Sequence, residues 1–558
     1  MRYKVAFFVA IVVAIVFVTP LIFVEVLFTS ASSFISTLSN PKLPGLLFTT
    51  FYPGMIASII STGFGLVYAW IVHRTDVPGR RILAILPFLG LTTPALVRAI
   101  GLYFLFHPHV GLVNVLFMQF FGVNFPLFNV LSVNGLILAN GIGGFPFHYL
   151  LLTAAIRTFD PRLEDSARIT GSSLFRTFTR VTMPALIPAL VVVYIQGIII
   201  SASAFDYAFI FSSATSGGLN VLATEIYDAV AENIPPEYAF AANLSLIYFI
   251  FTICLVSIYI YFVRKQRYQS QASGSDRYTR FTLSRRGKAI ALIVCAVILF
   301  IAIFMVLGII FLVSILPSFA YGASLTAFTL SNYTTLLLTK SFPFFWIALK
   351  NSLLAATVTA LITTFLAPII VYAIYRTNNR FAKILEYFNF IPVAIPGTVY
   401  GFALLVMFLR IPLLADHIYN TIWAPIIALV IVWLPFSIRL QSGSAIYIKK
   451  EAEEAAFVSG ASWFRMVRTV FVPMLSAGVF VSFGYVFVDS LRDLGAIYLL
   501  ATGSTYLLPS FLADAFTSTA ANFGIMSATA TIMTLIAVVA VVLVDRVSGG
   551  KFLLRADD

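Results

Sequence analysis

Long apolar runs dominate this chain of 558 residues, and they restrict it to one class of fold. A helix needs about 20 apolar residues to cross a bilayer, because every backbone polar group must be satisfied within the segment. Only 10% of the residues are charged and 60% are hydrophobic, which is typical of polytopic membrane proteins. We therefore expect an all-α polytopic membrane protein with twelve transmembrane helices, at about 5–28, 50–72, 82–105, 131–155, 185–211, 238–263, 289–316, 347–375, 386–409, 421–438, 474–500 and 524–545.

The distribution of basic residues predicts how these helices are oriented. Lysine and arginine are enriched in cytoplasmic loops close to transmembrane helices. With the amino terminus inside, the cytoplasmic segments contain 29 of the 35 lysines and arginines, and the outer loops 106–130 and 212–237 contain none. We therefore expect a multi-pass protein of the cell membrane with both termini in the cytoplasm. The net charge of +13 then reflects topology, so no nucleic-acid partner is expected.

The two halves of the chain repeat one another. A basic stretch rich in serine and glutamine, 264–288, separates a first half (1–263) from a second half (289–558), each with six apolar runs. Because six is an even number, both halves enter the membrane from the same side, as in a parallel repeat. Four matches share an offset of 289 residues, which indicates a duplicated unit: Pro146-Phe147 with Pro435-Phe436, Gly171 with Gly460, Phe175-Arg176 with Phe464-Arg465, and Pro184 with Pro473.

Each half contains one polar loop between apolar runs, at about 157–184 and 441–473. In the first loop, Asp160 can cap a helix that has Pro161 at its first position, where a missing N–H is tolerated. Gly171 and Gly460 predict a sharp turn after each helix. A single loop of this kind is explained equally well by an amphipathic helix lying on lipid. Two copies in one register favour a docking surface for another protein.

The second loop contains Glu454-Ala455-Ala456, then Gly460 and Pro473, and it resembles the EAA loop of permease subunits of binding-protein-dependent ABC importers. The first loop departs from this pattern with Asp165-Ser166-Ala167, and the second has Lys449-Lys450 where the first has Asp-Pro. In that family the loop forms a short helix that docks in a groove of a separate ATPase subunit. The resemblance implies a fused permease of the type I ABC importer kind, with two ATPase subunits and these coupling residues: Asp165, Ser166, Ala167, Gly171, Pro184, Glu454, Ala455, Ala456, Gly460 and Pro473.

Further segments, at 220–227, 392–399 and 492–500, resemble the ferric-iron branch of these permeases. That resemblance implies import of ferric iron delivered by an extracytoplasmic binding protein. The branches for thiamine, phosphonate and polyamine share much of the pattern and stay open. The chain has no phosphate-binding Gly-rich motif with Gly-Lys-Ser/Thr, so ATP is expected on the partner subunits. We expect no cofactor, no metal site and no catalytic residues in this chain.

Charged residues within apolar runs are costly and mark candidates for the translocation path. They are Arg98, Asp206, Asp489, Arg492 and Asp493. Asp206 and Asp493 fall near equivalent places in the two halves. They could form a two-sided acidic mouth for a cation, or they could pair with Arg98 and Arg492 and hold the helices together; ion pairing is the usual way to tolerate buried charge. Proline pairs in the third and ninth runs, Pro87/Pro94 and Pro392/Pro396, predict kinks that are either packing features or hinges.

One alternative belongs to another class of transporter. An ion-coupled secondary transporter also has twelve spans in two parallel halves, but it needs no docking helix. The paired polar loops therefore favour the ATP-driven importer.

Overall fold

The computed structural model describes residues 4–547, except 159–160, 216–218, 268–279, 318–327, 340–341, 377–394, 446–447 and 519–521. The described part is helical, with a single isolated β-bridge between Thr75 and Phe281. The helices of the first half are α1 Lys4–Phe28, α2 Ala31–Leu38, α3 Leu43–Arg74, α4 Arg80–Ile85, α5 Pro87–Thr92, α6 Ala95–Phe106, α7 Leu112–Phe121, α8 Val133–Thr158, α9 Pro161–Ile169, α10 Leu174–Thr177, η1 Phe178–Thr182, α11 Met183–Ala202, α12 Phe205–Ser213, α13 Leu222–Tyr227, η2 Asp228–Glu232 and α14 Tyr238–Arg267. Those of the second half are α15 Arg285–Leu299, η3 Phe300–Phe304, α16 Met305–Ser314, α17 Ser331–Leu338, α18 Pro343–Arg376, α20 Gly397–Arg410, α21 Pro412–His417, α22 Trp423–Ala445, α23 Lys450–Val458, α24 Trp463–Met466, η4 Val467–Phe471, α25 Val472–Met474, α26 Ser476–Arg492, η5 Tyr498–Leu500, α27 Leu508–Thr517 and α28 Phe523–Val547.

The described helices account for eleven of the twelve expected spans. Nine are long and apolar enough to cross a membrane, and two more are bent pairs, Arg80–Thr92 with Ala95–Phe106 and Trp463–Met474 with Ser476–Arg492. The ninth expected span, 386–409, is described only from residue 395 onward, where α20 is a 14-residue apolar helix. The described residues therefore confirm the fold class, with eleven spans in place of a full twelve.

Two expected spans end earlier than their apolar runs do. The fifth was expected to reach residue 211, but α11 ends at Ala202 and α12 begins at Phe205. The eleventh was expected to reach residue 500, but α26 ends at Arg492. Hydropathy does not detect these helix ends, because the residues after each break are again mostly apolar and buried.

Proline explains the break in the third span. Its two parts meet at 94°, and Pro94 precedes α6 with φ −58° and ψ 144°. Pro396 precedes α20 with nearly the same angles, φ −58° and ψ 146°. In the third span the extended Pro94 separates α5 from α6, and at both positions the proline ring fixes φ at the start of the following helix. Pro392, the other proline expected to kink the ninth span, lies outside the described residues.

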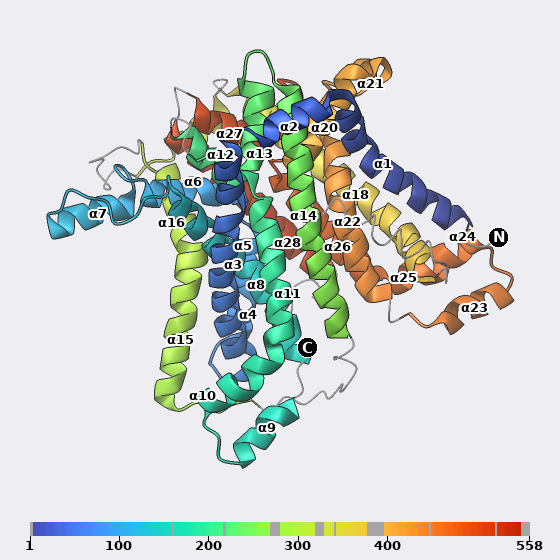
Figure 1. Cartoon of the computed structure of the whole chain (residues 1–558). Coiled ribbons are helices and arrows are strands. Elements are labelled where there is room, and N and C mark those ends of the chain that lie inside the picture. The colour runs from blue at the N-terminus through green and yellow to red at the C-terminus, as the bar shows by residue number, and fades with distance from the viewer. Residues whose placement is uncertain are drawn as a thin grey trace.

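The first helix of each half packs against the other half (Figure 1). Helix α1 lies along α18 and α20, while α15 and α16 contact α3 and α6. In one core cluster, Ala291 and Cys295 of α15 are buried together with Tyr68 of α3 and Phe145 of α8. The sequence repeat therefore does not correspond to two separate bundles, because each half completes the packing of the other.

The connection between the third and fourth spans is longer in the first half and shifts the register between the halves. Helix α7 lies in the connection between the third and fourth spans and projects sideways from the bundle (Figure 1). The corresponding connection in the second half, residues 411–422, is shorter. Equivalent positions before this connection, such as Arg74 and Arg376 or Pro94 and Pro396, therefore differ by 302 residues, and those after it differ by 289.

Candidate functional sites: the paired polar loops and an intramembrane charge cluster

Each polar loop folds into the same sequence of short helices. Helices α9 and α23 contain nine residues each, and α10 and α24 contain four each. A five-residue π-helical segment follows in both loops, η1 and η4. All of these boundaries are related by the offset of 289. Helix α9 begins at Pro161, as expected, whereas the expected cap Asp160 lies outside the described residues.

The turn between the two short helices is also the same in both loops. Gly171 and Gly460 each have a φ of +82°, a left-handed conformation that glycine adopts without strain. Their N–H groups donate to the carbonyls of Arg168 and Phe457, at 2.9 and 3.0 Å. The next residue in each loop donates to the carbonyl of Ala167 or Ala456 at 3.0 Å. This double hydrogen bond is the Schellman arrangement, and it agrees with the sharp turn predicted from the glycines.

Large apolar side chains project from both loops at matched positions. Ile169 and Val458, the last residues of α9 and α23, are 87% and 90% exposed. Phe175 and Phe464, in α10 and α24, are 75% and 69% exposed. Exposed apolar groups that form a set on a polar element mark an interaction surface. Ile169 and Val458 were not among the predicted coupling residues, although both are aliphatic and lie 289 residues apart in the sequence.

The predicted coupling residues lie around this surface. Ser166, Glu454 and Ala455 are exposed, while Asp165 is partly exposed and forms an ion pair of 3.7 Å with Arg168. The two prolines are exposed but differ in setting. Pro184 lies in an unbroken span, Phe175–Ala202, whereas Pro473 precedes a 76° bend before α26.

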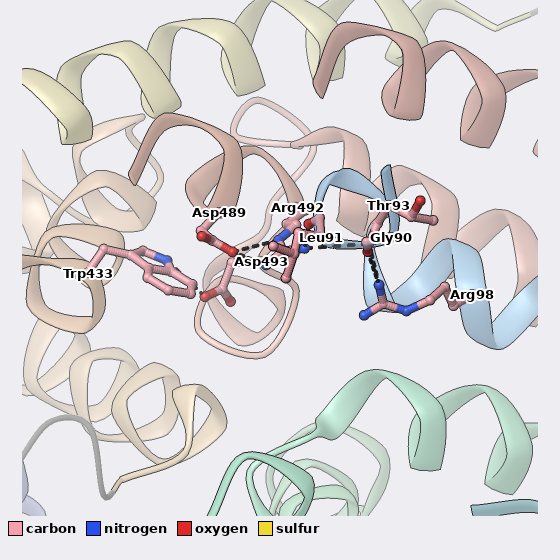
Figure 2. Close-up of polar contacts among 8 residues, drawn as sticks. All are labelled: Gly90, Leu91, Thr93, Arg98, Trp433, Asp489, Arg492 and Asp493. Atoms are coloured by element: carbon pink, nitrogen blue, oxygen red, sulfur yellow. Dashed lines mark hydrogen bonds and ion pairs between the residues drawn. The ribbon is translucent and has the colours of Figure 1, made fainter. Parts of the chain in front are cut away.

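The intramembrane charges do gather at one place, where α26 of the second half meets the bend of the third span (Figure 2). Arg492 forms an ion pair with Asp489, one turn earlier on α26, with Nε 2.6 Å from Oδ1. Its Nη1 donates to the carbonyl of Leu91, next to the bend in the other half. The break at Pro94 leaves carbonyls of α5 without helical donors, and the guanidinium satisfies one of them.

Arg98 satisfies neighbouring carbonyls of the same bend from within its own half (Figure 2). Its Nη1 donates to the carbonyls of Gly90 at 2.6 Å and Thr93 at 2.9 Å. Its Nε donates to the hydroxyl of Tyr207 on α12 at 2.8 Å. Two arginines, one from each half, therefore bind the carbonyls at the carboxyl end of α5.

The other two acids lie just beyond the helix ends described above. Asp493 accepts hydrogen bonds from Trp433 Nε1 at 3.1 Å and from the Ala496 N–H at 3.0 Å. Asp206 lies in the first turn of α12, and its Oδ1 is buried without a hydrogen-bond partner among the described residues. The expected pairing of Asp206 and Asp493 with the two arginines is therefore not seen among the described residues, because Arg492 pairs with Asp489 instead. In the described part of the chain, neither Asp206 nor Asp493 has a basic group within ion-pair distance.

A glycine on α8 makes room for this cluster, which gives a first prediction. A Cβ on Gly143 would collide with the Tyr207 hydroxyl and lie 3.4 Å from Arg98 Nε. We expect Gly143→Ala to lower the free energy of unfolding by about 1–3 kcal/mol, because the overpacked side chains must shift. The temperature at which the detergent-solubilised protein loses its monodisperse peak in size-exclusion chromatography measures this change. Gly63→Ala is the matched control, since a Cβ there meets nothing within 4 Å, and equal behaviour of the two variants would contradict the prediction.

Comparison with known proteins agrees with the paired loops. The family described as binding-protein-dependent transport system inner membrane component matches residues 367–550, which include the second polar loop. A putative ferric transport system permease protein of Haemophilus influenzae is 26% identical over 465 residues, covering 82% of this chain and 70% of the relative. The ferric transport system permease protein of Actinobacillus pleuropneumoniae is 25% identical over 467 residues, covering 84% of this chain and 65% of the relative.

A shorter relative matches about a third of the chain. The molybdenum transport system permease protein of Escherichia coli is 26% identical over 193 residues, which is 34% of this chain and 81% of the relative. The chain is therefore a multi-pass membrane permease homologous to those of binding-protein-dependent ABC importers, and its second half contains their inner-membrane domain.

Proposed function

We propose that this chain contains both transmembrane halves of an ATP-driven importer, and that two ATPase subunits dock on α9 and α23. The observation that carries the proposal is the matched pair of loops, each with an exposed apolar end beside its Gly turn. Both helices lie away from the end of the molecule where α2, α21 and α27 gather (Figure 1). The basic residues assign the α9 and α23 end to the cytoplasm, together with both termini. A binding protein would then deliver the solute at the opposite end.

We further propose ferric iron, or a small ferric complex, as the solute. Two relatives that cover more than four-fifths of this chain are described as ferric transport permeases, which supports this choice. ATP-driven closure of the partner subunits would rock the two halves between outward-open and inward-open states. Such a movement would break and remake the contact between Arg492 and Leu91, because these two residues belong to different halves.

Purification with its partners tests the proposal. We expect the chain to retain two copies of an ATPase subunit encoded beside it. In proteoliposomes, uptake of radioactive ferric iron should require both ATP and the loaded binding protein. A chain that transports iron alone, driven by an ion gradient, would instead be a secondary transporter. Uptake of thiamine, phosphonate or polyamine in place of iron would overturn only the proposed solute.

A further inference from the structure

Each docking helix has a second acidic residue that points into the protein instead of outward. Glu164 and Glu453 stand directly before Asp165 and Glu454, the acids of the EAA-like motif. Glu164 is 2% exposed and Glu453 is 6% exposed, whereas Glu454 is exposed. The two buried acids share the offset of 289, although neither belongs to the proposed docking surface.

In the first half, the partner of the buried acid is the last residue of α3. Arg74 is 1% exposed, and its Nη1 lies 3.5 Å from Glu164 Oε2. Its Nη2 also donates to the carbonyl of Ile156 near the end of α8, at 2.8 Å. The other carboxylate oxygen of Glu164 accepts a hydrogen bond of 2.6 Å from Thr182, the last residue of η1. One buried ion pair thus joins the docking helix to two transmembrane helices and to the π-helical segment.

The second half repeats this arrangement with different neighbours. Arg376 is the last residue of α18, and its Nε lies 2.7 Å from Glu453 Oε1. Its Nη2 donates to the carbonyl of Ile448, just before α23, at 2.6 Å. Its guanidinium lies over the ring of Phe471, 6.0 Å from the centroid. Phe471 occupies the position of Thr182 in the other loop, so an aromatic contact replaces a hydrogen bond.

An aromatic residue one turn before each arginine contacts the second part of the loop. Trp70 and Phe178 have ring centroids 5.1 Å apart in an edge-on arrangement. Tyr372, at the position of Trp70, makes a similar contact at 5.1 Å with Phe471, one turn further along the loop than Phe178. The ends of α3 and α18 therefore contact both parts of each helix–turn–helix, through an arginine and an aromatic side chain.

Stability alone does not explain two buried ion pairs. Desolvating both charges costs about as much as their attraction returns, and well-packed apolar residues often serve equally well. Burial is the largest influence on the Glu453 carboxyl and raises its pKa, while Arg376 opposes that shift. What an ion pair adds is a fixed geometry, since a displaced partner leaves a buried charge uncompensated.

We propose that the ion pairs Arg74–Glu164 and Arg376–Glu453 act as struts that transmit movement of the docking helices to α3 and α18. The inference rests on the proposed function, because the movement originates in docked ATPase subunits. The chain connections alone are poor transmitters, since each docking helix is followed by a Gly turn. In the second half, movement of α18 can reach the intramembrane charge cluster. Helix α18 packs along α22 and α26, and α26 contains Asp489 and Arg492. The struts are positioning residues and touch no solute.

The test removes the charges of both struts without leaving a buried charge uncompensated. The variant combines Arg74→Met with Glu164→Gln and Arg376→Met with Glu453→Gln. Its matched control is Glu451→Gln, which removes an exposed acid from the same helix α23. In the reconstituted complex, we expect ATP hydrolysis within about two-fold of the unaltered protein, but iron uptake per ATP lower by about 10-fold. Uptake per ATP equal to that of the control would overturn the inference.

A second measurement does not depend on ATPase subunits or on the solute. In the full chain purified alone, we expect amide hydrogen exchange of residues 161–169 and 450–458 to accelerate by about 10-fold in the variant, but not in Glu451→Gln. Unchanged hydrogen exchange in both segments would overturn the inference that the ion pairs hold the docking helices in place, even if transport by the variant fell. If the unaltered chain instead binds no ATPase subunit, the proposed function fails, and exchange alone decides whether the ion pairs hold the helices in place.

Discussion

Replacing the exposed apolar ends of both docking helices by aspartate should release the ATPase subunits. In Ile169→Asp/Val458→Asp, each site loses the burial of one aliphatic side chain, which contributes about 1.5–3 kcal/mol. We therefore expect affinity for the ATPase to fall by at least about 10-fold at each site. ATP-driven uptake should fall with it, while membrane insertion should be unaffected because both side chains lie outside the spans.

The amount of ATPase retained by the purified chain measures this effect. Ile234→Asp is the matched control, because Ile234 is 96% exposed in the loop after η2, between spans and away from both polar loops. Full retention of the ATPase by the double variant would show that this surface does not dock it. Loss of retention in the control as well would point to a general defect of the protein.

Removing Arg492, which joins the two halves, should strongly lower the thermal stability of the protein. Arg492→Ala leaves Asp489, only 2% exposed, without its cation and leaves the Leu91 carbonyl without its donor. Breaking a buried ion pair on one side typically costs about 3–5 kcal/mol. We expect the variant to lose its monodisperse form at a clearly lower temperature than the unaltered protein.

A neutral pair separates the effect of charge from that of packing. Asp489→Asn/Arg492→Gln keeps two polar side chains and removes one positive and one negative charge, so the net charge of the cluster is unchanged. We expect it to be considerably more stable than Arg492→Ala, since position 489 no longer carries a buried carboxylate that has lost its cation. If the two variants lose structure at the same temperature, the ion pair is not what stabilises this contact between the halves.

The sequence alone determined the class of fold and the positions of the spans. Crossing a bilayer depends on the length and polarity of one continuous segment, so a local count of apolar residues is sufficient. Eleven of the twelve expected spans are recognisable among the described helices. The sequence also identified the polar loops, since their Gly turns and short helices are local features that recur with a fixed offset.

Only the tertiary structure decided which side of each docking helix faces inward. Glu164 and Asp165 are adjacent in sequence, yet one is buried against Arg74 and the other is partly exposed. Successive residues on a helix point about 100° apart, so the assignment depends on where the end of α3 lies. Sequence reasoning selected the motif acids and missed the buried ones, because no local signal distinguishes them.

Contacts between the halves were equally out of reach of the sequence. The hydrogen bond from Arg492 to Leu91 joins residues 401 positions apart. Helices α1 and α15 each pack against the opposite half, and the hydropathy of the sequence does not indicate this packing. The physical reason is that the sequence of a segment specifies which apolar side chains it must bury and which charges and hydrogen-bonding groups need a partner. Which neighbour meets that need is settled only when all the helices pack together.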